Sequence, residues 1–113
     1  MKLEEENCVP CEGGVPPLQA HEEDELHRYV SNWLLDRTAD THKLRCRFTQ
    51  DDFVQTMALV NRIASVAEKQ GHHPEMLVGY GKLVVEFYTH AICGLSTNDF
   101  IMAAKVNLLA QAA

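Results

Sequence analysis

The chain has 113 residues, which is enough for one domain with a modest core and too few for a second independent domain. Its 16 acidic and 10 basic residues give a formal net charge of -6, which disfavours nonspecific attraction to the phosphates of nucleic acids. No apolar run approaches the roughly 20 residues needed to cross a bilayer, and residues 1–6 lack the apolar stretch of a signal peptide. These features predict a soluble cytoplasmic protein with no direct nucleic-acid or membrane partner.

Cysteine usage also indicates a reducing compartment. Cys46 and Cys93 lie in apolar segments, where a reduced thiol packs as a small hydrophobe. Cys8 and Cys11 have the spacing of half a zinc site, but no second CxxC or HxxxH pair follows at a suitable distance. We therefore expect a structural turn at residues 8–11 in preference to a metal or redox site.

An irregular arm is predicted for residues 1–20, ahead of a single domain formed by residues 21–113. Gly13-Gly14 and Pro16-Pro17 disfavour regular structure in the arm. From His21 to Asn32, Leu26, Tyr29 and Val30 share one apolar helical stripe, so a first helix is predicted there.

Two short strands follow, over residues 33–38 and 43–49, with turn-forming residues 39–42 between them. In the second strand Leu44, Cys46 and Phe48 alternate with polar residues, which predicts one buried and one wetted face.

A long helix is expected next, because Thr49-Gln50-Asp51-Asp52 is suited to a helix start with the threonine hydroxyl as the cap. Gly71 supplies the stop. The predicted buried stripe of this helix consists of Phe53, Met57, Val60, Ile63, Ala64 and Ala67.

The remaining pattern is a second hairpin, residues 76–80 and 82–90, followed by a last helix that starts at Ser96-Thr97-Asn98-Asp99. The predicted order is α-β-β-α-β-β-α. Paired hairpins without alternating single strands indicate an α+β domain, in which three helices cover one face of a four-stranded antiparallel sheet. The other face of the sheet is expected to be exposed or used for binding.

Two adjacent histidines, His72 and His73, lie between the helix-ending Gly71 and Pro74. The proline disfavours helical backbone at His73, so the two side chains should point to opposite sides and would not easily share one metal ion. Other candidate ligands fall in no familiar spacing: His90, Glu68 and Asp99. The spacing alone leaves metal binding, catalysis and a polar turn that caps the helix all open.

The neighbours of this pair favour proton transfer. Glu68 precedes His72 by four residues, so a continuing helix would let the carboxylate orient the imidazole. His90 ends the last predicted strand, from which an antiparallel neighbour could bring it back beside the pair. Without a recognisable nucleophile elbow or glycine-rich phosphate loop, two imidazoles and a carboxylate suggest acid–base chemistry.

Several motifs in register resemble the signature of the pterin-4a-carbinolamine dehydratases, also known as 4a-hydroxytetrahydrobiopterin dehydratases. These are E-x-x-x-H-H-P at residues 68–74, an aromatic at Tyr80, T-H at residues 89–90 and G-L-S-x-x-D at residues 94–99. The segment C-x-x-C-x-G-G-x-P-P-L at residues 8–18 resembles the leader of bacterial-type members. Further similarities are Trp33, Phe48, Asp52-Phe53 and Val60-Asn61.

The resemblance implies dehydration of 4a-hydroxytetrahydropterin to quinonoid dihydropterin, which recycles the pterin of aromatic amino acid hydroxylases such as phenylalanine hydroxylase. It implies no metal and no organic cofactor. His72 and His90 would be the acid–base pair, supported at His72 by Glu68. The substrate-binding residues would be His73, Pro74 and Asp99, the last of which would position His90 or the substrate.

This reaction agrees with the residues, because it needs one proton delivered to oxygen and another removed from nitrogen. Histidine, with an ordinary pKa of about 6.5, suits both transfers near neutral pH. One position departs from the pattern: many relatives carry an acidic residue after the T-H pair, where this chain has Ala91. Any polar contact made there is therefore in doubt, but not the role of His90.

A protein-binding role is the alternative function. The resemblance includes animal relatives that stabilise dimers of a homeodomain transcription factor, and others that assist enzyme assembly. The family also forms dimers and tetramers. Apolar residues around Phe87, Tyr88 and the last helix exceed what one stripe buries, so a homodimer or homotetramer through that helix and an edge strand is expected.

Overall fold

The computed structural model describes residues 2–10 and 15–111 of the chain. The expected turn at Cys11 and the Gly13-Gly14 pair lie outside these ranges. The helices and strands, in chain order, are η1 (Leu3–Glu5), α1 (Ala20–His27), η2 (Arg28–Val30), β1 (Leu34–Asp36), β2 (Lys43–Thr49), α2 (Phe53–Gln70), β3 (Glu75–Val78), β4 (Lys82–Phe87), η3 (His90–Ile92) and α3 (Thr97–Gln111), where η denotes a 3₁₀-helix.

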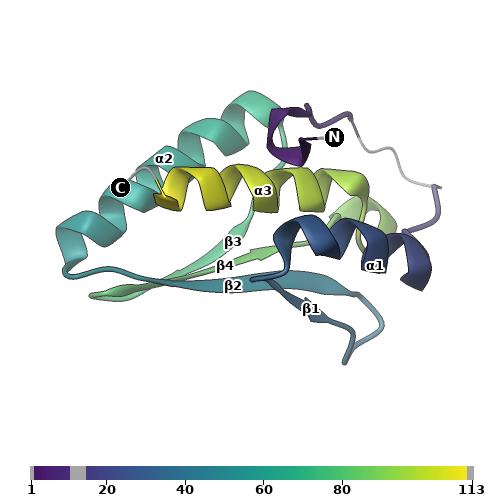
Figure 1. Ribbon diagram of the computed structural model, residues 1–113, viewed down its shortest axis with the longest axis horizontal. Coiled ribbons are helices and arrows are strands. Elements are labelled where there is room, and N and C mark those ends of the chain that lie inside the picture. The colour runs from purple at the N-terminus through teal and green to yellow at the C-terminus, as the bar shows by residue number, and fades with distance from the viewer. Residues whose placement is uncertain (1, 11–14, 112–113) are drawn as a thin grey trace.

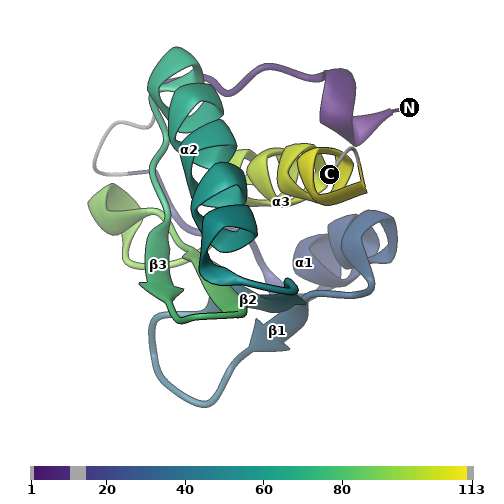
Figure 2. The same cartoon turned by 90° about the vertical axis from the view of Figure 1, so that its left-hand side faces the viewer.

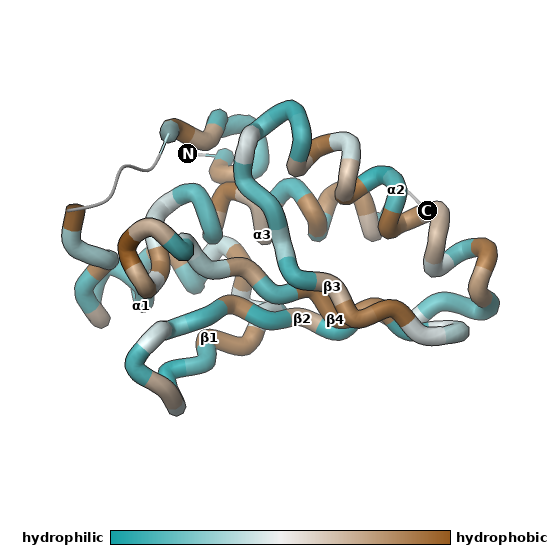
Figure 3. Tube along the Cα trace, turned by 180° about the vertical axis from the view of Figure 1, so that it is seen from behind, coloured by the Kyte–Doolittle hydropathy of each residue, from teal (hydrophilic) through white to brown (hydrophobic). Residues whose placement is uncertain are grey.

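The strands form one antiparallel sheet in the order β1-β2-β4-β3. All three α-helices lie on one face of this sheet, with α3 between α1 and α2 (Figures 1 and 2). The expected α+β architecture is therefore confirmed. The opposite face carries exposed apolar side chains, among them Leu34, which is 57% exposed, and Leu77, which is 60% exposed. The hydrophobic run of β3 is visible in Figure 3.

Alternation along the two central strands builds the core. In β2, Leu44 and Cys46 are buried, as their spacing predicts. They pair directly with Phe87 and Val85 of β4, so four apolar side chains project toward the helices from adjacent positions. Trp33 packs against the Phe87 ring, with ring centroids 5.8 Å apart.

The boundaries of α2 follow from its caps, and one of them differs from the expectation. The cap is Asp52, whose carboxylate accepts from the Gln55 N–H at 2.9 Å, whereas Thr49 still belongs to β2. The threonine assignment was wrong because both residue types cap helices well and the sheet register continues to Thr49. At the other end Gly71 adopts φ +66°, and its N–H bonds to the Ala67 carbonyl.

The buried stripe of α2 is rotated from the expected one. Thr56, Leu59, Ile63 and Ala67 are buried, whereas Phe53 is 50% exposed and Ala64 is exposed. Both sets have helical spacing, so the sequence does not tell which face meets the sheet. On the outer side of this helix Phe53, Val54 and Ala64 are exposed, whereas Val60 is half-buried against the core.

The first helix ends earlier than expected, since the α-helical turns stop at His27 and a 3₁₀ turn follows. Val30 is fully buried and Leu26 packs against the core, but Tyr29 is 49% exposed. Glu23 is buried beside Arg37, whose Nε donates to it at 2.9 Å.

The last helix is buried on nearly all sides, which accounts for its excess of apolar residues. Phe100, Ile101 and Met102 are each at most 4% exposed. The cover on the outer side is η1, whose Leu3 is 1% exposed and lies in the core, and the Lys105 ammonium donates to the Glu4 carbonyl at 2.9 Å. Figure 1 shows the N-terminal segment lying along α3.

The last strand is shorter than expected, because β4 stops at Phe87 and His90 is the first residue of η3. Thr89 pairs with Gly94 across this short loop and turns its hydroxyl toward α3. No helix in the described parts of the chain has the length and apolar character to span a membrane.

Candidate active site

Three histidines converge on one cavity of about 270 Å³ at the end of the molecule where α2 stops and α3 starts. His72 and His73 follow the last turn of α2, and His90 begins η3. The cavity lining comprises Val9, Gly71, His72, His73, Thr89, His90, Ala91 and Asn98. The arrangement thus brings together side chains that the sequence separates by up to 89 positions, from Val9 to Asn98.

His72 is held by Asp99. Its Nε2 lies 2.6 Å from Asp99 Oδ1, the histidine side chain is 12% exposed and the aspartate is completely buried. The imidazole also stacks nearly parallel to the Phe87 ring, at an interplanar angle of 12°. An ionised carboxylate can only accept, so Nε2–H donates to Asp99 and Nδ1 is the nitrogen left to exchange a proton with a ligand.

Asp99 is itself held by two further donors. Its Oδ2 accepts from the Thr89 hydroxyl at 2.7 Å and from the Ser96 N–H at 2.9 Å. The Ser96 hydroxyl lies 2.8 Å from that of Thr89, which extends the network by one more group. Asp99 occupies the first turn of α3, where the positive end of the helix dipole favours a carboxylate. The predicted S-x-x-D helix start therefore doubles as the support of His72.

His73 contacts the other carboxylate, through its Nε2 and Glu68 Oε2. Both side chains are exposed, at 58% and 76%. The sequence led us to expect Glu68 against His72, but α2 ends at Gln70 and the left-handed Gly71 takes His72 off the helical path. The carboxylate partners therefore differ from the expected ones: the buried Asp99 is bonded to His72, and the exposed Glu68 contacts His73.

His90 also lines the cavity and is exposed. Its ring stacks at a tilt on Tyr88, with centroids 4.1 Å apart, and the Lys43 ammonium lies 4.8 Å from the centre of the same tyrosine ring. Asp99 was expected to position His90 or the substrate, and the histidine to which it is bonded is His72.

The predicted site residues divide into two groups. The three histidines line the cavity. Asp99 is bonded to His72, Glu68 contacts His73, and Pro74 directly precedes β3. Sequence reasoning assigned no role to Thr89, Ser96, Val9 or Asn98. The signal for the first two was present in the T-H and S-x-x-D motifs, but nothing local indicated Val9.

No metal centre was found among residues 2–10 and 15–111, where no group of three or more His, Cys, Asp or Glu side chains could hold an ion. The arrangement instead offers two imidazoles of different exposure, His72 and His90, in the lining of one small cavity. One imidazole has a fixed orientation and the other is open to solvent, which suits the delivery and removal of protons.

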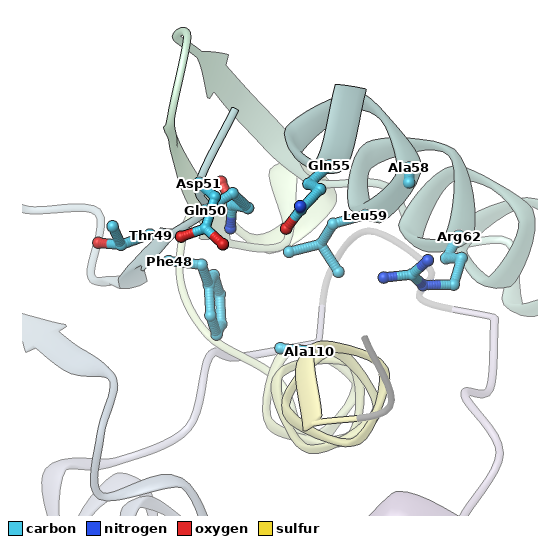
Figure 4. A pocket seen from close by; sticks show the side chains of 9 residues that line it. All are labelled: Phe48, Thr49, Gln50, Asp51, Gln55, Ala58, Leu59, Arg62 and Ala110. Carbon is cyan, nitrogen blue, oxygen red and sulfur yellow. The ribbon is translucent and has the colours of Figure 1, made fainter. Parts of the chain in front are cut away.

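A second cavity of about 460 Å³ lies between α2, the end of β2 and the end of α3 (Figure 4). Its lining consists of Phe48, Thr49, Gln50, Asp51, Gln55, Ala58, Leu59, Arg62 and Ala110. Arg62 Nε is buried there without a hydrogen-bond partner among the described residues. Because this cavity has no histidine, it lacks the groups that transfer protons near neutral pH, and we place the candidate chemistry at the histidine cavity.

Comparison with known proteins gives a consistent result. The family model described as Pterin 4 alpha carbinolamine dehydratase matches residues 16–109. A relative from Nitrosomonas europaea, provisionally named a pterin-4-alpha-carbinolamine dehydratase, is 49% identical over 108 residues, which cover 95% of this chain and 92% of the relative. One of the same provisional name from Rickettsia bellii is 41% identical over 108 residues, covering 95% and 93%.

Solved structures share the fold. A Brucella melitensis protein titled transcriptional coactivator/pterin dehydratase superposes with a TM-score of 0.77 at 29% identity, covering 83% of this chain and 98% of the other. A pterin dehydratase-like protein described as a RuBisCO assembly factor of the α-carboxysome gives a TM-score of 0.61 at 22% identity, covering 73% and 93%. At that identity, the second match shows the fold alone.

Proposed function

Because the chain belongs to the pterin-4a-carbinolamine dehydratase family, we propose that it dehydrates 4a-hydroxytetrahydropterin to quinonoid dihydropterin and water. The observation that carries this proposal is the cavity lined by His72, His73 and His90, with His72 bonded to a buried carboxylate. The reaction would recycle the pterin used by an aromatic amino acid hydroxylase in the cytoplasm.

The dehydration needs two proton transfers and no redox change. The bond between C4a and the hydroxyl oxygen breaks, the oxygen takes a proton and leaves as water, and N5 loses its proton as the C4a=N5 bond forms. His72 and His90 are the proposed acid–base pair. Each such transfer contributes roughly 10²- to 10⁴-fold, which is enough for a substrate that already loses water unaided.

The remaining site residues have supporting roles in this proposal. His73 and Pro74 hold the pterin ring, and Glu68 supports His73 through the contact between their side chains. Asp99 positions His72 through the 2.6 Å bond. The reaction as proposed uses neither a metal ion nor an organic cofactor.

Substitution of the two histidines tests the assignment. Decay of 4a-hydroxytetrahydropterin is followed by absorbance with the wild type, with His72→Ala and with His90→Ala, each against the spontaneous rate. We expect each variant to lose at least tenfold of the accelerated rate and the double variant to approach the uncatalysed rate. His21→Ala, at an exposed position of α1, is the matched control and should react like the wild type. Full activity of both site variants would contradict the acid–base assignment.

A protein-binding role is the second candidate, favoured by the uncovered apolar face of α2. Phe53 and Ala64 are exposed on one side of the helix, Val60 between them is half-buried against the core, and Val54 nearby is 77% exposed. Exposed apolar helix faces commonly mark interfaces. We propose that this face joins copies of the chain into a homodimer or homotetramer, and the same face could serve a different protein partner.

A further inference from the structure

The N-terminal arm reaches the histidine cavity at Val9. Its N–H donates to the Asn98 side-chain oxygen at 3.0 Å, and the Asn98 side-chain nitrogen donates to the Val9 carbonyl at 2.6 Å. This reciprocal pair joins a segment near the start of the chain to the first turn of α3. Asn98 is 3% exposed, and both residues line the cavity.

Neighbouring contacts fix the arm on the N-terminal side of this pair. The Cys8 N–H donates to the Gln70 side-chain oxygen at 2.7 Å, and the Gln70 side-chain nitrogen donates to the Asn7 side chain at 3.2 Å. Further toward the N-terminus, Leu3 is buried in the core. Gln70 is the last residue of α2 and Asn98 is next to Asp99, so the elements that position His72 also position Val9.

Most of the Val9 side chain is open to solvent. It is 66% exposed although both polar groups of its backbone are bonded to Asn98. Val9 also borders a neighbouring cavity of about 330 Å³, which the control residue Val15 lines as well. The backbone bonds hold this apolar residue at a fixed place beside a small polar cavity. A flat ring bound there could pack against the valine, and the contact would remove apolar surface from water.

We propose that Val9 is a substrate-contacting residue that packs on the bound pterin, and that Asn98 is the positioning residue that holds it there. This inference rests on the proposed function. The arm then acts as a wall of the site and determines where the ring lies relative to His72 and His90. The contact is present both in the bound ground state and in the transition state. Its loss should therefore weaken substrate binding more than it slows the chemical step.

The test compares Val9→Ala with Val15→Ala, which removes the same atoms from a valine of the same arm that is 59% exposed and does not line the histidine cavity. Two quantities are measured: the Kd of 7,8-dihydrobiopterin, a stable pterin without the 4a hydroxyl, and kcat and KM for the dehydration. We expect Val9→Ala to raise Kd and KM about three- to tenfold with kcat within about twofold. Val15→Ala should match the wild type.

A double-mutant cycle separates positioning from general stability. Asn98→Ala should raise Kd by a factor similar to that of Val9→Ala, and combining the two should add little, because both remove one contact. Additive effects of the two substitutions on Kd would overturn the role of Asn98. If the wild type is active and binds the pterin but Val9→Ala leaves Kd unchanged, the inference is overturned and the proposed function remains intact. A wild type that neither binds the pterin nor accelerates its dehydration would overturn both.

Discussion

Asp99 is the residue on which the site geometry most depends. Its carboxylate is completely buried and receives bonds from His72, Thr89 and Ser96, so it is well satisfied as an acceptor only while all three donors are present. It caps α3 and orients an imidazole with the same pair of oxygens. Burial explains how one side chain can do both, because solvent does not compete for either oxygen.

The first prediction concerns Asp99→Asn. An amide presents one acceptor and one donor where the carboxylate presents two acceptors, so it cannot favour donation from His72 Nε2 and still accept from both Thr89 and Ser96. We expect kcat of the dehydration to fall by about 10²-fold or more. The matched control is Glu68→Gln, the same change at the exposed carboxylate beside His73, for which a loss below tenfold is expected. Equal effects of the two substitutions would contradict the positioning role.

At the scale of elements, the end of α2 sets the course of the segment that carries the two histidines. Gly71 adopts φ +66°, a conformation unfavourable for residues with a Cβ, and a Cβ at this position would meet no other atom within 4 Å. The cost of substitution there is therefore conformational and not steric. The left-handed residue also separates His72 from Glu68, which a continued helix would have brought together.

A stability prediction follows for Gly71→Ala. Forcing an alanine into the left-handed region should lower the free energy of unfolding by about 1–2 kcal/mol. Gly71→Asn should cost less, since asparagine tolerates this region better. Chemical denaturation measures both variants, and a Gly71→Ala variant as stable as the wild type would show that the helix end does not require this conformation.

The last residue of β1, Asp36, is a carboxylate whose pKa gives the stability of the fold a dependence on pH. The hydroxyl and N–H of Thr38 and the guanidinium of Arg45 donate to Asp36 and hold its pKa well below the usual range. A lowered folded-state pKa stabilises the fold at pH values above the unfolded pKa, about 3.9, and this stabilisation is lost as the pH falls through the folded value.

The corresponding test is the difference in unfolding free energy between wild type and Asp36→Asn. We expect the wild type to be the more stable at pH 7, with the difference narrowing at pH 3. Asp40→Asn, at an exposed position of the loop that follows β1, is the control and should show a smaller dependence on pH. A difference that grows toward acid pH would contradict the assigned sign.

At the scale of the whole molecule, the features that depend on neighbouring residues were predictable and those that depend on distant packing were not. The alternation in residues 43–49 and the turn residues between the strands were enough to predict the antiparallel sheet and the helices that cover it. The pairing of His72 with Asp99 spans 27 positions and arises because the end of α2 lies beside the start of α3. The burial of Leu3 had no local signal, since a single leucine in a charged segment has no periodicity.

The choice of buried face on α2 shows the same limit. Ile63 and Ala67 are buried as predicted, but two stripes of similar spacing include them, and only the arrangement of the sheet and α3 decides that Leu59 faces inward while Phe53 faces outward. The other stripe then remains for association. The expected interface through the last helix stays a prediction, since η1 covers one side of α3 whereas Leu108 near its end is 53% exposed.

A charge placed on that outer stripe tests self-association. Phe53→Glu should convert an oligomer into a smaller species, measured by light scattering after size-exclusion chromatography, because a carboxylate would have to be buried in the interface. Ala39→Glu, at an exposed position of the loop that follows β1, is the control and should leave the mass unchanged. If the wild type is a monomer, or if Phe53→Glu keeps the wild-type mass, α2 does not form the interface.

The most direct test of the central claim is the rate at which 4a-hydroxytetrahydropterin disappears at neutral pH with and without the purified wild-type protein. We expect the protein to accelerate the reaction at least about 10²-fold at saturating protein. The acceleration should remain after treatment with a chelator, since the proposed chemistry uses histidine protons and no metal. An identical rate in the presence and absence of the protein would contradict the dehydratase assignment and leave the protein-binding role of this fold as the better account.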